Sequence, residues 1–178
     1  GKFVDGVGGG VCQVSTTLYN CALLSDLEIL CAHRHSLPVS YVAPSFDAMV
    51  STRSDLVFVN STASPIKIKT TADDTKISIS IYGDIMTRKV VARSVVIKTL
   101  PFETEEVMDS NIPLGTILTL ARGKNGIKSN AYIDIYEDSK YVATRLLRRD
   151  SYNSQKQIVA IGTKPLEPEI NIAEDELP

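Results

Sequence analysis

The stretch that decides the fold is GGGVCQVSTTLYNCALL, residues 8–24. Glycine reaches backbone angles closed to other residues, so the glycine run allows a sharp turn close to a substrate. Apolar residues then recur at helical spacing and predict an amphipathic helix over about residues 11–24; they are Val11, Val14, Leu18, Cys21 and Ala22. Cys12 would lie in the first turn, where unpaired N–H groups and the helix dipole favour a thiolate. Cys12 is therefore a candidate nucleophile, the alternative being a small buried residue at the start of a core helix.

Length and charge exclude some classes of function. The chain has 178 residues and a formal net charge of −2, with no long run of either sign. This balance gives no support to binding of nucleic acid or of a membrane surface by charge. No stretch approaches the roughly 18 apolar residues of a membrane span. The chain begins at Gly1 rather than Met and runs straight into the glycine run, so we expect a piece of a longer protein.

The rest of the first part, to residue 86, reads as strands. Pro38 and Pro44 rule out a continuous helix, and residues 39–42 between them form a plausible short strand. Period-two alternation predicts further strands at 55–60, 65–72 and 76–83, separated by the turn sequences NSTAS and DDT. We therefore expect residues 1–86 to form an α+β domain, a helix followed by an antiparallel meander with one solvent-facing side.

The second part, residues 87–164, carries almost only strand signal and predicts an elongated all-β module. Two strands are expected around a turn at residues 137–140, and the glycines at 115, 123, 126 and 162 are interpreted as turn markers. Residues 165–178, PLEPEINIAEDELP, are acidic and rich in proline, which predicts a tail or the start of a linker.

A cysteine nucleophile needs a base, and the chain offers only His33 and His35. Residues two apart in a strand-like segment point to the same side, so both could face the site or both could face solvent. His35 lies just before Pro38, where the backbone is held firmly, and we favour it as the partner of Cys12. His33 remains the other candidate, and either could instead be an ordinary surface or core residue.

Other polar residues are candidates for binding substrate or orienting the base. Gln13 and Thr16 lie near Cys12 on the predicted helix, although a solvated helix face is the alternative for them. Asp47 could orient an imidazole, and Tyr41 could hydrogen-bond a substrate. Each of these two is as readily explained as a turn residue or an aromatic at the edge of the core.

Metal and cofactor binding are not favoured by the spacings. The three cysteines, at positions 12, 21 and 31, contain no C-x-x-C pair. A nucleotide-binding loop would need Lys-Ser/Thr after its glycines, and Cys12-Gln13 stands in that place. We therefore predict no metal and no cofactor. A disulfide between Cys21 and Cys31 stays open, because the direction of the Cys21 side chain does not follow from sequence.

Two family resemblances cover nearly the whole chain before the tail. The blocks GGGVCQVSTTLYN, HSLPVSYV, DAMV and KISISIYG resemble the C-terminal half of a VanW domain, over residues 1–83. VanW domains occur in exported, cell-wall-associated proteins of Gram-positive bacteria. Residues 88–164, with PLGT, ARGKNGIKSNAY and AIGTK, resemble a G5 domain, a β module associated with polymers that contain N-acetylglucosamine. The resemblances imply an extracellular, cell-wall-associated protein whose membrane anchor, if any, lies outside this chain.

The VanW resemblance also implies a reaction, L,D-transpeptidase chemistry on peptidoglycan stem peptides. Cys12 would be the nucleophile and His35 its base. The thiolate would attack the carbonyl of an L,D-peptide bond, the terminal D-residue would leave, and an amine of a neighbouring stem would resolve the thioester. Backbone N–H groups around Gly10, Val11 and Gln13 would stabilise the oxyanion.

The departures from the VanW pattern leave a second hypothesis open. The segment that normally precedes the glycine block is missing, so the site would be open and a second copy could complete it. Ser45 and Phe46 stand where the family usually has glycine, which puts substrate specificity in doubt. The alternative function is a non-catalytic protein that binds peptidoglycan or glycan, or serves as a scaffold of the cell envelope, with Cys12 in a structural role.

Overall fold

The structure, a computed structural model, describes residues 10–166 and confirms the predicted helix. Helix α1 spans Val11–Leu24, and the backbone N–H groups of Gln13 and Val14 donate to the carbonyl of Gly10 at its start. Cys12 therefore lies in the first turn, as predicted. The first two glycines of the glycine run and tail residues 167–178 lie outside the described residues.

The buried face of α1 is not the predicted one. Val11 and Val14 are 52% and 42% exposed. The buried residues are Ser15, Thr16, Tyr19, Ala22 and Leu23. The hydroxyls of Ser15 and Thr16 point inward because the segment packed on them presents backbone groups, the C=O and N–H of Ala48. The predicted apolar face was therefore wrong: of its five residues, only Ala22 is among the buried residues of the helix.

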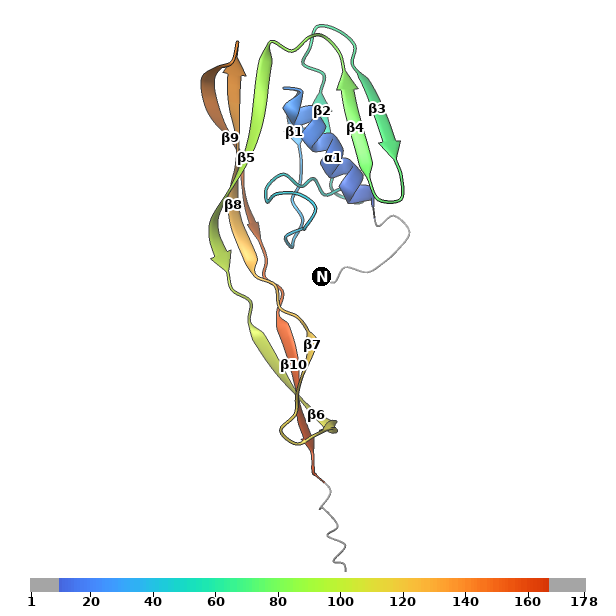
Figure 1. Cartoon of the computed structure of the whole chain (residues 1–178), viewed down its shortest axis with the longest axis vertical. Coiled ribbons are helices and arrows are strands. Elements are labelled where there is room, and N and C mark those ends of the chain that lie inside the picture. The colour runs from blue at the N-terminus through green and yellow to red at the C-terminus, as the bar shows by residue number, and fades with distance from the viewer. Residues whose placement is uncertain (1–9, 167–178) are drawn as a thin grey trace, which may run out of the picture. The chain divides into compact units, whose positions relative to one another are not determined.

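Two small antiparallel sheets accompany the helix, as Figure 1 shows. β1 (Glu28–Cys31) pairs with β2 (Val57–Val59), and β3 (Lys67–Ala72) pairs with β4 (Ile77–Tyr82). The predicted strands at 55–60, 65–72 and 76–83 are thus confirmed with shorter bounds, whereas β1 was not predicted. The continuous meander was wrong, since β2 pairs back to β1 rather than to β3.

Residues 39–42 form no strand, contrary to prediction. The whole segment between β1 and β2 is irregular, apart from short bridges such as that between His33 and Met49. Pro38 and Pro44 lack the N–H donors that a ladder needs. Ser45 adds a left-handed backbone conformation, with φ of 68°. This segment has no strand ladder and is held instead by hydrogen bonds to the helix and to a strand of the second part.

The second part of the chain is all strand, as predicted. The long antiparallel sheet has the order β5 (Arg88–Leu100), β8 (Gly126–Glu137), β9 (Lys140–Tyr152). β8 and β9 join at the predicted turn, where Asp138 and Ser139 have φ of 47° and 64°. Two positive φ values in a two-residue loop are typical of hairpins, because they match the twist of the strands.

The remaining strands form a separate sheet in the order β6 (Thr104–Pro113), β10 (Gln157–Lys164), β7 (Ile117–Ala121). β10 runs parallel to β6 and antiparallel to β7. The chain divides into two compact units, one made of Gly1–Pro101 with Asn125–Ser154 and the other of Phe102–Lys124 with Gln155–Pro178. Sheet β5–β8–β9 consequently belongs to the same compact unit as the helix.

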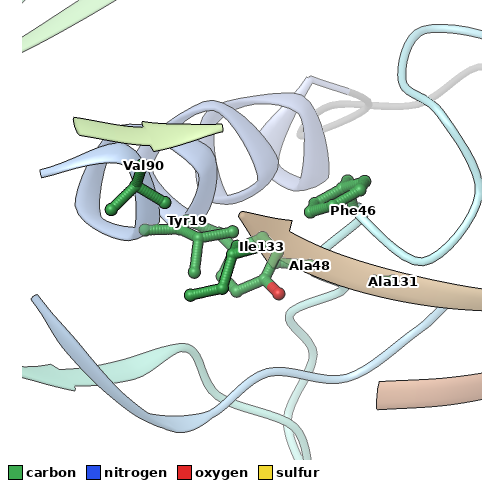
Figure 2. Packing of buried hydrophobic residues seen from close by; sticks show 7 residues of the cluster. Tyr19, Phe46, Ala48, Val90, Ala131 and Ile133 are labelled. Carbon is green, nitrogen blue, oxygen red and sulfur yellow. The ribbon is translucent and has the colours of Figure 1, made fainter. Parts of the chain in front are cut away.

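One core joins the helix to this long sheet. Tyr19 of α1 packs with Val90 of β5 and Ile133 of β8, and Figure 2 shows these side chains directed toward one another. Phe46 and Ala48, from the irregular segment, complete the cluster. The core therefore includes strands from the second part of the chain, and their inner face is buried where α1 lies on it.

Two of the glycines have roles other than the predicted turns. Gly115 does sit in a turn, with φ of 84°. Gly126, however, begins β8, where an added Cβ would lie 2.5 Å from the carbonyl oxygen of Tyr152. Gly162 lies inside β10, and a Cβ there would lie 2.0 Å from the carbonyl oxygen of Pro113. Close approach of backbones, rather than a turn, requires these two glycines.

Ile133→Ala tests the shared core. Ile133 is 0% exposed, so its truncation should lower the free energy of unfolding by about 3 kcal/mol through lost burial and a residual cavity. Urea titration followed by circular dichroism measures this. Ile97→Ala, at a position on β5 that is 57% exposed, is the matched control and should change little; equal losses in the two variants would contradict the assignment of the core.

Candidate functional site

Asp47 is the centre of the candidate site. Its side chain is 0% exposed, and its two carboxylate oxygens accept four hydrogen bonds. Oδ2 accepts from the backbone N–H of His35 at 2.6 Å and from His35 Nδ1 at 2.7 Å. Because an ionised carboxylate can only accept, Nδ1 carries the proton and Nε2 of a neutral imidazole is left as an acceptor. The structure thus brings Asp47 to the imidazole that it was predicted to orient.

The other two hydrogen bonds to Asp47 come from strand β9. Arg148 Nη2 donates to Oδ1 at 2.9 Å, and the hydroxyl of Tyr152 donates to the same oxygen. Arg148 also donates from Nε to Asp150 at 2.6 Å, and its guanidinium lies 5.8 Å from the ring centroid of Tyr19. We call His35, Asp47, Arg148 and Tyr152 the Asp47 cluster.

The surroundings of Asp47 favour its charged form. Burial alone would raise the pKa of the carboxyl, but the hydrogen bonds from His35 and Tyr152 and the charge of Arg148 outweigh it and lower the pKa below its ordinary value. Burial and the hydrogen bond to Asp47 raise the pKa of Tyr152 well above the usual range. At neutral pH the cluster therefore holds an ionised carboxylate and a neutral phenol.

Helix α1 holds the segment that carries Asp47. Thr16 accepts from the backbone N–H of Ala48 at 3.0 Å. Asn20 donates to the carbonyl of Phe46 at 2.8 Å. On the other side, the backbone N–H of Ser45 donates to the Tyr152 hydroxyl at 2.7 Å. The irregular segment is therefore fixed between the helix and β9 although it lacks secondary structure of its own.

The predicted contact between Cys12 and His35 is not formed. Cys12 is partly buried, and its thiol donates to the carbonyl oxygen of Val50 at 3.5 Å. Tyr41 lies beside His35: the two rings meet edge-on, with their centroids 6.4 Å apart. The imidazole of His35 thus contacts Asp47 and Tyr41, whereas the Cys12 thiol bonds to Val50.

The remaining predicted residues lie at the helix start or in its buried face. Val11 and Gln13 are exposed, and Thr16 is buried against Ala48. Gly10 has φ of −91°, an ordinary value, and open space around it. The Thr17 hydroxyl donates back to the carbonyl of Gln13 at 2.7 Å.

The other two cysteines are free thiols, so the Cys21–Cys31 disulfide is not formed. Cys21 donates to the carbonyl of Ile79 at 3.4 Å. Cys31 Sγ lies 3.1 Å from Nε2 of His33, at an exposed position. The thiol that contacts a histidine is therefore Cys31 rather than Cys12. Within residues 10–166, no group of three or more His, Cys, Asp or Glu side chains is placed to hold a metal ion.

Sequence reasoning missed Arg148 and Tyr152, the β9 half of the Asp47 cluster. They lie 101 and 105 residues from Asp47 along the chain. In the sequence these two residues belong to a strand pattern, and nothing near them predicts that their side chains bind Asp47. The one available signal was their position on the same side of β9, which period-two alternation gives.

A cavity of about 810 Å³ opens elsewhere in the same unit, at the C-terminal end of α1. Its lining includes Leu27, Asp26, Arg88 and Arg145, and none of the residues of the Asp47 cluster or Cys12. This cavity is therefore separate from the thiol and the imidazole.

The fold and the site define an α+β unit whose buried His–Asp–Arg cluster is completed by strands of a β module. The comparisons give the particular class: residues 1–82 match the family described as "VanW like protein", and residues 91–164 match the G5 domain. The chain thus carries a VanW region followed by a G5 domain.

Individual relatives cover parts of the chain. The protein YoaR of Bacillus subtilis (strain 168) is 39% identical over 84 residues, which are 47% of this chain and 28% of YoaR. The IgA1 protease G5 domain structure is 20% identical with a TM-score of 0.30, covering 46% of this chain and 99% of that one. The HP0197-G5 crystal structure is 33% identical with a TM-score of 0.25, covering 42% and 97%. Within residues 10–166, no helix has the length and apolarity to cross a membrane.

Asp47→Asn tests the electrostatics of the cluster. The folded-state pKa of Asp47 is lowered, so its contribution to stability is full above the unfolded value of about 3.9 and is lost as pH falls through the folded value. We expect the variant to lose about 3 kcal/mol at pH 7, because Arg148 is left buried without this partner. Unfolding free energies from pH 7 down to 3 should show the gap between wild type and variant closing in acid.

The control for this measurement is Asp138→Asn, at an exposed turn with positive φ that asparagine tolerates. It should keep the wild-type stability and the wild-type pH dependence. A gap between wild type and Asp47→Asn that stays constant over the whole pH range would contradict the assignment.

Proposed function

We propose that the chain is a non-catalytic binding module of the bacterial cell envelope, which holds glycan or peptidoglycan outside the cell. The observation that carries this proposal is the partner of Cys12: its thiol donates to the Val50 carbonyl, at 3.5 Å, and not to an imidazole. A thiol in that arrangement supports the irregular segment by bonding to its backbone, which is a structural role.

The Asp47 cluster has a structural explanation of the same kind. All four of its hydrogen bonds fasten residues 35 and 47 to each other and to β9. The cluster thereby ties the irregular segment of the VanW region to strand β9, which lies in the G5 domain. A binding protein gains from such a connection, because less conformational freedom is lost when the ligand binds.

Sedimentation with purified peptidoglycan sacculi tests the binding function. The wild-type chain should pellet with sacculi, and Cys12→Ala should pellet equally, because in this proposal the thiol takes no part in binding. The control is the same chain in urea above its unfolding midpoint, which should stay in the supernatant. A folded wild-type chain that stays in the supernatant with sacculi would overturn the proposal.

A second candidate, cysteine-dependent acyl transfer on peptidoglycan stem peptides, is favoured by one specific observation. His35 Nδ1 is fixed on Asp47 at 2.7 Å, which leaves Nε2 as an acceptor in the way that a general base requires. For catalysis, the Cys12 thiol would leave Val50 and pass its proton to Nε2 of His35. The thiolate would then attack the carbonyl to form a thioester, and the terminal D-residue would leave with the proton held on Nε2. The N–H group of Val11 would stabilise the oxyanion, since that of Gln13 already donates to the carbonyl of Gly10.

Intact mass spectrometry after incubation with synthetic tetrapeptide stems separates the two candidates. The binding proposal predicts no acyl adduct on wild type. The acyl-transfer candidate predicts an adduct equal to the stem less its terminal residue, lost in Cys12→Ala. Cys31→Ala is the matched control, because Cys31 is the thiol in contact with a histidine; an adduct that disappears only in this variant would assign the reactive thiol to Cys31.

A further inference from the structure

The β5–β8–β9 sheet has a second face, opposite the helix, on which no other helix or strand of residues 10–166 packs. Val90 of β5 and Ile133 of β8 point inward to the core. Side chains alternate along each strand, so the residues next to these two point outward. Cross-strand pairing places Arg93 beside Tyr132, Asp134 beside Thr144, and Tyr136 beside Tyr141. We call these six residues the outer face.

The polar groups of the outer face form one connected set of hydrogen bonds. Arg93 donates to Asp134 from Nε and Nη2, at 3.2 and 3.4 Å. Thr144 donates to the same carboxylate, and the hydroxyl of Tyr141 donates to Thr144 at 3.0 Å. These bonds fix the side chains before any ligand arrives. The hydrogen bond from Arg93, with that from Thr144, lowers the pKa of Asp134, so its charge offsets that of Arg93 at neutral pH.

The aromatic rings of the outer face are arranged beside this polar set. Tyr136 and Tyr141 meet edge to face, with centroids 5.9 Å apart and planes at 74°. The Arg93 guanidinium lies over the ring of Tyr132, 4.9 Å from the ring centroid. Tyr141 is 59% exposed, so its ring is accessible from solvent. The face therefore combines accessible rings with fixed donors and acceptors, and its central ion pair is neutral overall.

We propose that the outer face binds a neutral glycan, with a pyranose ring on Tyr141 and its hydroxyl groups toward Thr144 and Asp134. A pyranose presents apolar C–H groups on its faces and hydroxyls around its edge, which matches rings flanked by hydrogen-bonding groups. A polyanion is disfavoured, because Arg93 is already paired with Asp134. This inference rests on the proposed binding function and assigns it to particular residues.

Titration calorimetry with the soluble β-1,4-linked N-acetylglucosamine tetramer, on the full chain, tests the site. Tyr141→Ala should weaken binding by about tenfold or more, since a stacked ring contributes on that scale. Tyr141→Phe keeps the ring and should retain most of the affinity. The matched control is Tyr82→Ala, because Tyr82 ends β4 and is 55% exposed, close to the 59% of Tyr141; it should bind as wild type does.

Sacculus sedimentation with the same variants separates this inference from the function on which it rests. Weakened pelleting of Tyr141→Ala alone, with an unchanged unfolding midpoint in urea, would support the outer face. Equal pelleting and equal tetramer affinity in both alanine variants would overturn the outer face as the glycan site and leave the binding function standing. Failure of the wild type to pellet would overturn the binding function itself.

Discussion

The rest of the unit depends on the burial of one charge, the carboxylate of Asp47. An ionised group without contact with solvent is strongly unfavourable unless every lone pair finds a donor. The donors here are the imidazole and backbone of His35, together with Arg148 and Tyr152 of β9. Segments more than a hundred residues apart in sequence must therefore be in place together. Folding of the VanW region and pairing of β8 with β9 are coupled through this cluster.

The same constraint explains how an irregular segment can be well fixed. The segment between β1 and β2 has no ladder of its own, so its backbone groups find partners in side chains: Thr16 and Asn20 of the helix, and Tyr152 of β9. That is also why the buried face of α1 is partly polar. A helix that packs on bare backbone needs hydroxyl and amide groups where a helix that packs on a sheet would need leucine.

Sequence predicts the features that local pattern governs and fails where distant segments decide. The bounds of α1 and the hairpin of β8 and β9 follow from periodicity and turn chemistry, and the pairing of Asp47 with an imidazole was expected as one role for that residue. The face of α1, the loop at 39–42 and the β9 donors depend on what packs against them. Tyr152 illustrates the difficulty, because nothing near it in sequence distinguishes a strand tyrosine from the donor to a buried carboxylate 105 residues away.

Side chains that alternate along β8 serve two different faces of the sheet, the face packed on the helix and the outer face. Ile133 is buried in the shared core, whereas its neighbour Asp134 lies on the outer face and binds Arg93 and Thr144. Because successive side chains point to opposite faces, the inner residues are constrained by the helix and the outer ones by whatever meets the sheet from solvent. A chain that needed these strands only to support Asp47 would not need an ordered set of aromatic and polar groups on the other side. The contacts that join the sheet to the helix and the groups that we propose to bind glycan thus come from the same strands, at positions one residue apart.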